Sequence, residues 1–248
     1  EQRLDFTIEE RTAELMQDAL PLLNRVSGER IRNELFLMLR EEHPADNLAR
    51  LDEVGVLARI QASLRWDDGI ATAMATLRET QPDADPVSGI ALLCLKLNES
   101  ETIEAAKRLR LSQAQTERVL QVNRLARLET QLSDASSQPS AIVQLLEPFR
   151  EEVLRLAPAI FRAETARARV SRYLAEWRAV RPMLDGHHLQ AMDIPRGPLY
   201  RVILEKLRAA RLDGEVRTVE QEEELARKIV VSGKCIGHKL RSRGICQA

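Results

Sequence analysis

Basic residues around the Pro195–Pro198 corner have the types and the spacing to bind an anion. A helix is predicted to begin at Pro198, because the first turn of a helix tolerates the N–H group that proline lacks. The free N–H groups of that turn attract anions, and Arg196 would lie beside them. The candidate anion site comprises Arg196, Gly197, Arg201, Lys206, Arg208 and Arg211. The anion that best matches this row of cations is a nucleic-acid phosphate.

Two other groups of residues could do chemistry, but the sequence argues against both. Asp83 and Asp85 are spaced like carboxylates that hold Mg²⁺ for phosphoryl transfer, yet they lie between two prolines in a predicted loop rather than on a strand. His187 and His188 are adjacent, so on a helix they point about 100° apart and cannot easily share one metal ion. We therefore predict no catalytic residue and no metal ligand in this chain.

The elements that must position these residues are predicted to be helices throughout. Only 3% of the residues are aromatic, while Leu, Ala, Arg and Glu, which favour helices, are abundant. Capping boxes are predicted at Thr7–Glu10 and Thr218–Gln221, and Ser27 is predicted to cap a further helix. Residues 113–132 and 160–181 are each predicted to form one helix. The absence of any run of 18 apolar residues predicts that no membrane is crossed.

Charge is divided unevenly along the chain. Residues 1–104 carry a net charge of −10 and residues 105–248 a net charge of +9. Six of the cations in the second half lie close together: Lys107, Arg108, Arg110, Arg118, Arg124 and Arg127. A basic half is typical of a protein that binds a polyanion, although a solvated, salt-bridged helical surface has the same composition. The three widely spaced cysteines favour a reducing, cytoplasmic location.

Two stretches resemble parts of the family of tRNA nucleotidyltransferases (CCA-adding enzymes) and bacterial poly(A) polymerases. Leu184–Thr218 resembles the C-terminal tail of that family, and Phe6–Glu9 together with Val26–Leu35 resembles its neck. The resemblance implies an all-α, elongated array of helices. Together with the loss of periodicity after residue 230, it divides the chain into a neck-like domain at 1–64, an RNA-binding body at 65–183, an RNA-binding tail at 184–230 and a disordered basic tail at 231–248.

The resemblance also implies roles for particular residues. Glu29, Arg30 and Glu34 would support the nucleotide site from the neck, although Arg30 and Glu34 could simply pair across one helical turn. The body and tail would bind RNA, with tRNA as the expected partner. The catalytic head of the family has no counterpart in this sequence, which begins with Glu1 and resembles a fragment. Mg²⁺ and ATP or CTP are expected in that head, and the head is itself an expected partner.

Several alternatives stay open at this stage. A helical protein–protein interaction module without an RNA ligand is the main rival, and an exposed apolar groove would favour it. The parent protein resembles a nucleotidyltransferase, so whether this chain is itself an enzyme is left undecided. The sequence does not distinguish CCA addition from A addition or poly(A) synthesis, and it does not indicate the oligomeric state.

Overall fold

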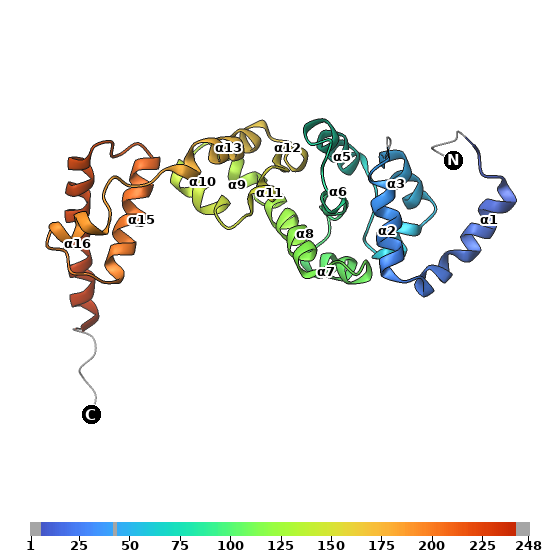
Figure 1. The fold of residues 1–248 in the computed structure, drawn as a ribbon, viewed down its shortest axis with the longest axis horizontal. Helices are drawn as coiled ribbons and strands as arrows, with labels where there is room; N and C mark the ends of the chain where they lie inside the picture. Colours follow the sequence, from blue (N-terminus) through green and yellow to red (C-terminus); the bar gives the residue numbers. More distant parts are fainter. Residues whose placement is uncertain (1–5, 42–43, 242–248) are drawn as a thin grey trace, which may run out of the picture. The chain divides into compact units, whose positions relative to one another are not determined.

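The computed structural model describes residues 6–41 and 44–241, with side chains described as far as residue 231. Every regular element in these ranges is a helix, so the predicted all-α fold is confirmed (Figure 1). The helices form two compact units. The first comprises the described residues up to Ser133 together with Phe149–Val170, and the second comprises Asp134–Pro148 and the described residues from Ser171 onward. The predicted domain boundaries lie at other positions and stay predictions.

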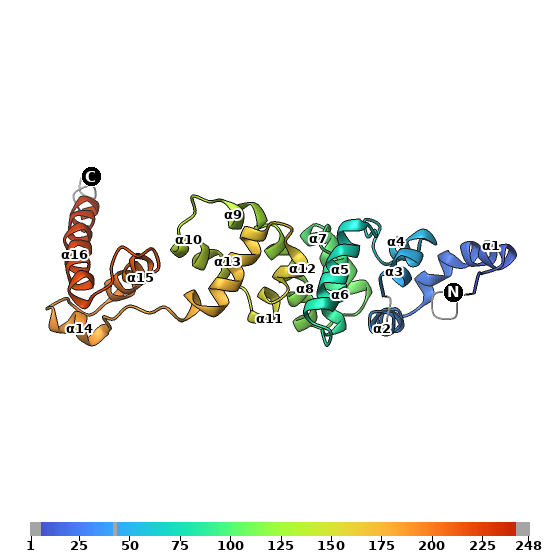
Figure 2. The ribbon, with the colours of Figure 1, turned by 90° about the horizontal axis from the view of Figure 1, so that it is seen from above.

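The first unit has a core made mainly of leucines. Leu57, Leu92 and Leu125 are fully buried, and α5 packs against α12 while α6 packs against α8 (Figure 2). The helices of this unit are α1 (Glu10–Ala19), the 3-10 helix η1 (Leu20–Arg25), α2 (Gly28–Met38), α3 (Pro44–Glu53), α4 (Val56–Ile60), α5 (Asp68–Thr80), α6 (Pro86–Leu93), α7 (Glu99–Arg108), α8 (Gln113–Ala126), α9 (Glu129–Ser133), α11 (Glu151–Leu154) and α12 (Ala157–Ile160).

The second unit is arranged around α15, which packs against α10 and α16. The division between the units falls within α13 (Glu164–Ala175). The other helices of the second unit are α10 (Pro139–Leu146), the 3-10 helix η2 (Trp177–Ala179), α14 (Gly186–Ala191), α15 (Pro198–Leu212) and α16 (Val219–Arg241).

One of the two predicted capping boxes is confirmed and the other is wrong. Before α16, the Gln221 N–H donates to Thr218 Oγ1 and the Thr218 N–H donates to Gln221 Oε1, both over 3.3 Å. At the other end of the chain, α1 does begin at Glu10, but the residue before it, Glu9, makes no side-chain cap. Thr7 therefore does not stand at the N-cap of α1, where the sequence pattern predicted it.

Three predicted boundaries also need correction. Residues 113–132 form two helices, α8 and α9, instead of one. The predicted helix at 160–181 is limited to α13, because the main chain leaves the helical conformation at Glu176, where φ is −124°, and Trp177 beyond it begins the 3-10 helix η2. The tail predicted to be disordered from residue 231 continues as α16 to Arg241, since an established helix adds residues at little cost. Residues 242–248 lie outside the described residues.

Candidate nucleic-acid interface

The helices α14, α15 and α16 share a small apolar core within the second unit. Leu189 from α14, Ile203 and Leu207 from α15, and Ala226 from α16 are all fully buried. The buried positions of α15 recur at helical spacing, so one face of this helix is committed to the core and the other faces are left for charged residues. This core fixes where the basic side chains of α15 point.

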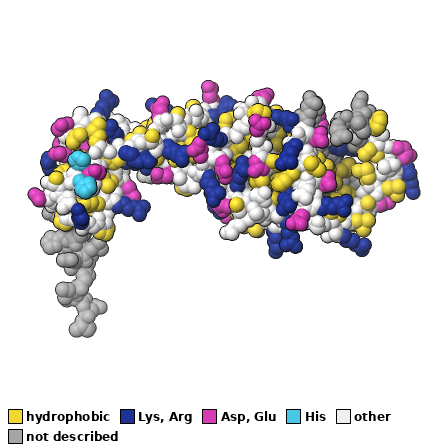
Figure 3. Space-filling view, viewed as in Figure 1, with side chains coloured by type: hydrophobic (Ala, Val, Ile, Leu, Met, Phe, Trp, Pro, Cys, Tyr) yellow, Lys and Arg dark blue, Asp and Glu magenta, His cyan; other side chains and the backbone are white. Residues whose placement is uncertain are grey.

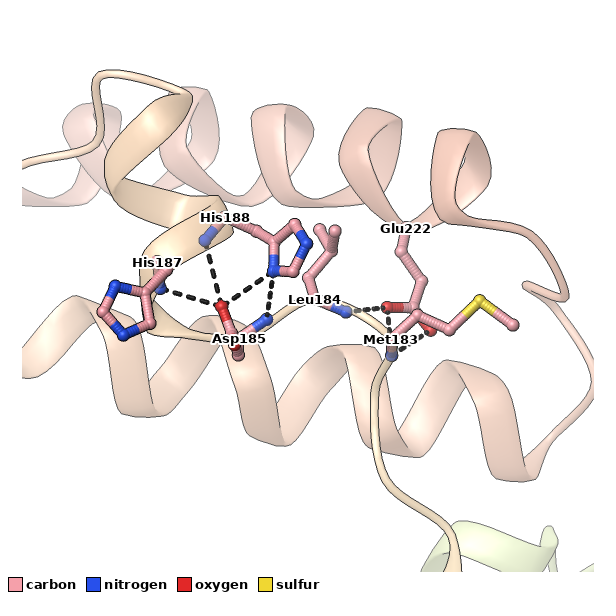
Figure 4. A network of polar contacts seen from close by, with 6 residues as sticks. All are labelled: Met183, Leu184, Asp185, His187, His188 and Glu222. Atoms are coloured by element: carbon pink, nitrogen blue, oxygen red, sulfur yellow. Dashed lines mark hydrogen bonds and ion pairs between the residues drawn. The ribbon is translucent and has the colours of Figure 1, made fainter.

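A buried carboxylate joins α16 to the segment that leads into α14. Glu222 is fully buried, and its Oε2 accepts the N–H groups of Met183 at 2.8 Å and Leu184 at 2.9 Å (Figure 4). Its Oε1 lies 3.2 Å from Arg211 Nη1. The carboxylate therefore satisfies two main-chain donors and a guanidinium in a place that water does not reach.

The histidine pair belongs to the start of α14. Asp185 Oδ1 accepts the N–H groups of His187 at 2.8 Å and His188 at 3.0 Å (Figure 4). The hydrogen bonds from the main chain and the ring of His188 lower the pKa of Asp185 to about 2. Both histidines are exposed, as the sequence interpretation expected. Asp185 thus serves as the N-cap of α14.

The Pro195–Pro198 corner leaves the first turn of α15 without a side-chain cap. Gly197 stands at the N-cap position, and no heavy atom lies within 4 Å of where its Cβ would be. Arg196 is exposed and donates to Gln190 Oε1. A hydrogen bond across the corner stabilises it, because Tyr200 Oη donates to the carbonyl of Ile194 over 2.8 Å. An open helix N-terminus beside an exposed arginine results.

Two further cations of α15 point into solvent. The Arg201 side chain is 85% exposed and lies 2.7 Å from Glu205 one turn later, and this hydrogen bond raises the pKa of Arg201. Lys206 is also exposed, and it has no ion-pair partner among the described residues. Arg196, Arg201 and Lys206 are thus the predicted site residues that a large anion can reach.

The other two predicted arginines of α15 turn toward the protein. Arg208 is 20% exposed, pairs with Glu147 at 2.8 Å and donates to the Val180 carbonyl at 3.1 Å. Arg211 is 28% exposed and pairs with buried Glu222. The expectation that Arg201 and Arg208 share a solvated face is therefore wrong for Arg208, because Glu147, at the C-terminal end of α10, covers it.

A hollow of about 510 Å³ lies between α10 and α15 in the second unit. Arg201 and Arg208 both line it, but so do Glu147 and Glu205, so its charges largely cancel. Ser140, also in its lining, is bound to Asp213 through its N–H and its hydroxyl, at 2.8 and 2.6 Å. This balance of charge makes the hollow a weaker anion site than the surroundings of Arg196 and Lys206, which lie outside it.

The predicted support residues of the neck lie on the exposed side of α2. Ser27 caps this helix as predicted, accepting the Arg30 N–H over 3.3 Å. Glu29, Arg30 and Glu34 are exposed, and none of the three has an ion-pair partner within the described ranges. The simple pairing of Arg30 with Glu34 is therefore not formed, and their role at a nucleotide site stays a prediction.

Sequence reasoning missed the contact that holds α2 in place. Arg108, at the end of α7, donates to the carbonyls of Leu23 at 2.8 Å and Val26 at 3.3 Å. Arg32 donates in return to the Arg110 carbonyl at 2.7 Å. Gly28 lies so close that a Cβ there would meet the Arg108 carbonyl oxygen at 2.0 Å. The glycine in the Ser27-Gly28-Glu29 motif was the available signal for a close approach.

Of the two aspartates Asp83 and Asp85, the second has a structural role. Asp85 caps α6 by accepting the Val87 N–H at 2.9 Å, and it pairs with Arg118 at 3.2 Å. Asp83 is exposed in the preceding turn. Across the described residues no group of three or more His, Cys, Asp or Glu side chains is arranged to hold a metal ion. In the same residues, none of the helices combines the length and the apolarity needed to span a bilayer.

Comparison with known proteins connects these features. A family described as the probable RNA and SrmB-binding site of polymerase A matches residues 5–65. An A-adding tRNA nucleotidyltransferase of Geobacter sulfurreducens is 28% identical over 94% of this chain, which covers 28% of that protein. A CC-adding tRNA nucleotidyltransferase of the same organism is 31% identical over 91% of this chain, which covers 60% of it. The chain thus spans less than two thirds of either relative.

Solved structures show that the fold is shared. The Thermotoga maritima CCA-adding enzyme complexed with tRNA superposes with a TM-score of 0.67 over 93% of this chain and 58% of that enzyme, at 21% identity. An apo form of a CCA-adding enzyme gives a TM-score of 0.69 over 93% of this chain and 56% of that one, at 21% identity. Over nearly its whole length the chain is therefore similar to the C-terminal part of the tRNA nucleotidyltransferases, and in residues 5–65 it is similar to the RNA-binding site of polymerase A.

Proposed function

We propose that this chain binds and positions RNA, with tRNA as the preferred ligand, for a nucleotidyltransferase that extends RNA 3′ ends. The observation that carries the proposal is the two exposed cations of this region that no acid pairs with among the described residues: Arg196, beside the uncapped N-terminus of α15, and Lys206, two turns further along the helix. Such cations contact phosphates and orient an RNA without reading its sequence. The described relatives act on tRNA, which supports the choice of ligand.

Nucleotide addition is assigned, within the same proposal, to a catalytic head. The described residues offer no cluster of metal-binding side chains, so Mg²⁺ and ATP or CTP would be held by the head of such an enzyme. Glu29, Arg30 and Glu34 would contact that head from the exposed side of α2 and support its nucleotide site. Leu37, on the same helix, is an exposed apolar side chain, and it favours a protein contact there.

The test is a tRNA titration at several salt concentrations with the full chain. Replacing Arg196 and Lys206 with Gln removes two exposed cations, and we expect the slope of log K against log salt to flatten by up to about two units. The matched control is Arg227→Gln on α16, since the charge of Arg227 is already balanced by Glu223 at 3.1 Å. Wild-type affinity and slope in the double variant would remove α15 from the RNA site. No binding by the wild-type chain would reject the proposed function.

A further inference from the structure

Two arginines of α15 are each paired with a carboxylate of the second unit. Glu147, at the C-terminal end of α10, lies 2.8 Å from Arg208 Nη1, and Glu205 lies 2.7 Å from Arg201 Nε. Both acids are open to solvent, since their side chains are 55% and 61% exposed. Because water reaches both carboxylates, another anion can also reach them and compete for the two arginines.

Both ion pairs lie at the hollow of about 510 Å³ between α10 and α15. The rest of its lining carries no charge and comprises Ser140, Val143, Gln144, Ala209 and Leu212. A space of this size is within the range that holds small-molecule ligands, so it has room for a phosphate group. The hollow thus presents two guanidinium groups to an anion, and an acid of this chain already occupies each of them.

The surroundings of Arg208 are rich in positive charge. Tyr173, on α13, is buried, and this burial raises the pKa of its hydroxyl, which the charge of Glu147 raises further. The opposite effect, a lowering of the same pKa, comes from Arg178, Arg208 and Arg181. Arg181 donates to main-chain carbonyls, which leave its charge in place. Figure 3 shows side chains of both signs, Lys and Arg in dark blue and Asp and Glu in magenta, on the surface around α10 and α15. Removal of the charge of Glu147 would therefore leave a positive surplus beside the hollow.

Glu147 determines whether the charge of Arg208 is available, while a second contact determines where Arg208 lies. Arg208 Nε donates to the Val180 carbonyl at 3.1 Å, so the guanidinium keeps its place when the carboxylate is absent. A carboxylate and a phosphate offer an arginine the same kind of charged oxygen acceptor. An RNA phosphate that binds Arg208 must therefore displace Glu147, and the contact that it gains replaces one that is lost.

We propose that Glu147 and Glu205 are autoinhibitory acids, which occupy the places on Arg208 and Arg201 that phosphates of an RNA would otherwise take. They hold the affinity of the second unit for RNA below the value that its arginines allow, and weaker binding shortens the residence of the RNA on the protein. This inference rests on the proposed function, because RNA is the competing anion. Its effect has the opposite sign, since removal of either acid tightens binding.

The decisive variant is Glu147→Gln in the full chain, titrated with tRNA at several salt concentrations. Glutamine keeps the length of the side chain and an oxygen acceptor for Arg208, but it has no charge. We expect tighter binding and a steeper salt slope, by up to about one unit, so the gain should shrink about threefold as salt rises from about 50 to about 200 mM. A partly unfolded protein would bind less tRNA, so unfolding cannot produce this result.

The gain must depend on the arginine that is released. Glu147→Gln combined with Arg208→Gln should lose the gain, because the charge that the first change makes available is then absent. Glu205→Gln, at an exposed position of α15, gives a second measure through Arg201, and it too should tighten binding. Glu215→Gln is the matched control: it removes the same charge from an exposed residue that has no ion-pair partner among the described residues, so it releases no arginine and should change binding less.

The outcomes separate this inference from the proposed function. Wild-type affinity in both Glu147→Gln and Glu205→Gln, or a gain that survives Arg208→Gln, overturns the inference. The double variant of Arg196 and Lys206 tests the proposed function separately, and weaker tRNA binding by that variant would leave the proposed function standing. If the wild-type chain binds no tRNA, both fail.

Discussion

The arginines of α15 and those at the α2–α7 junction are held in place by different kinds of partner. On α15, Arg208 and Arg211 are held by the carboxylates of Glu147 and Glu222, so their charges are neutralised. At the junction, Arg32 and Arg108 are held by main-chain carbonyls, so their charges remain. The same residue type therefore stabilises packing in both places, but only the second arrangement adds to the surface potential. Counting arginines along a sequence does not distinguish these cases.

The largest effect should come from replacing Glu222, the buried carboxylate that pairs with Arg211 of α15. Glu222→Ala would leave the Met183 and Leu184 N–H groups without an acceptor and Arg211 without a counter-charge. We expect the second unit to lose about 3 kcal/mol of unfolding free energy, measured by urea or thermal unfolding. Glu215→Ala is the matched control, because Glu215 is exposed in the turn before α16. Equal stability of the two variants would show that Glu222 does not bind the Met183 and Leu184 N–H groups tightly.

At the junction, the corresponding test is to disturb the close approach of α2 and α7. A Cβ at Gly28 would lie 2.0 Å from the Arg108 carbonyl oxygen, which is main chain and cannot swing away. Gly28→Ala should therefore force the two helices apart and lower the unfolding free energy of the first unit by about 2 kcal/mol. Gly197→Ala is the control, since nothing lies within 4 Å of its Cβ position. If Gly28→Ala left the unfolding free energy unchanged, α2 and α7 would have to lie further apart at Gly28 than the 2.0 Å contact implies.

These two sites show what the sequence could and could not predict. The corner at Pro198, the Ser27 cap and the Thr218–Gln221 box depend on residues close together in the chain, and all three formed. The inward turn of Arg208 depends on Glu147, which lies 61 positions earlier. Helical spacing predicted which residues share a face of α15, but it could not predict that another helix covers part of that face.

The contact at Gly28 was beyond sequence reasoning for the same reason. Its partner Arg108 is 80 positions away, and the six cations of residues 105–127 look alike when only their order is known. Packing between helices distant in sequence separates four of them, since Arg118 and Arg124 pair with acids whereas Arg108 and Arg127 donate to main-chain carbonyls. A single sequence therefore predicts the helical class, some helix caps and the candidate cations, while the selection among those cations needs the tertiary structure.

A smaller effect should distinguish Arg208 from Arg201. Arg208→Ala removes a largely covered ion pair and a bond to the Val180 carbonyl, so we expect a loss of about 1 kcal/mol in unfolding free energy. Arg201→Ala should have almost no effect on unfolding, because an exposed pair one helical turn apart contributes little. Neither variant should change tRNA affinity or the salt slope much, because Glu205 and Glu147 already balance the two charges. If Arg208→Ala weakens binding more at unchanged stability, its inward placement is wrong.

The smallest effect concerns the cap of α14, and it depends on pH. Hydrogen bonds from His188 and His187 lower the pKa of Asp185 from 3.8 to about 2 in the folded chain. A carboxyl with a lowered pKa contributes stability that is fully present above its unfolded value and is lost as the pH falls through the folded value. We therefore expect the contribution of Asp185 to be constant at neutral pH and to disappear between about pH 4 and pH 2.

The measurement is an NMR titration of the Asp185 carboxyl, together with unfolding curves of the wild type and Asp185→Asn from pH 7 to pH 2. Asn is also a good helix cap and does not titrate, so the two proteins should differ by a constant amount at neutral pH. Below pH 4 the wild type should lose stability relative to the variant, because only the wild type takes up a proton at this site. A midpoint near 3.8 for the Asp185 carboxyl would contradict the capping contacts, since an aspartate free of them titrates there.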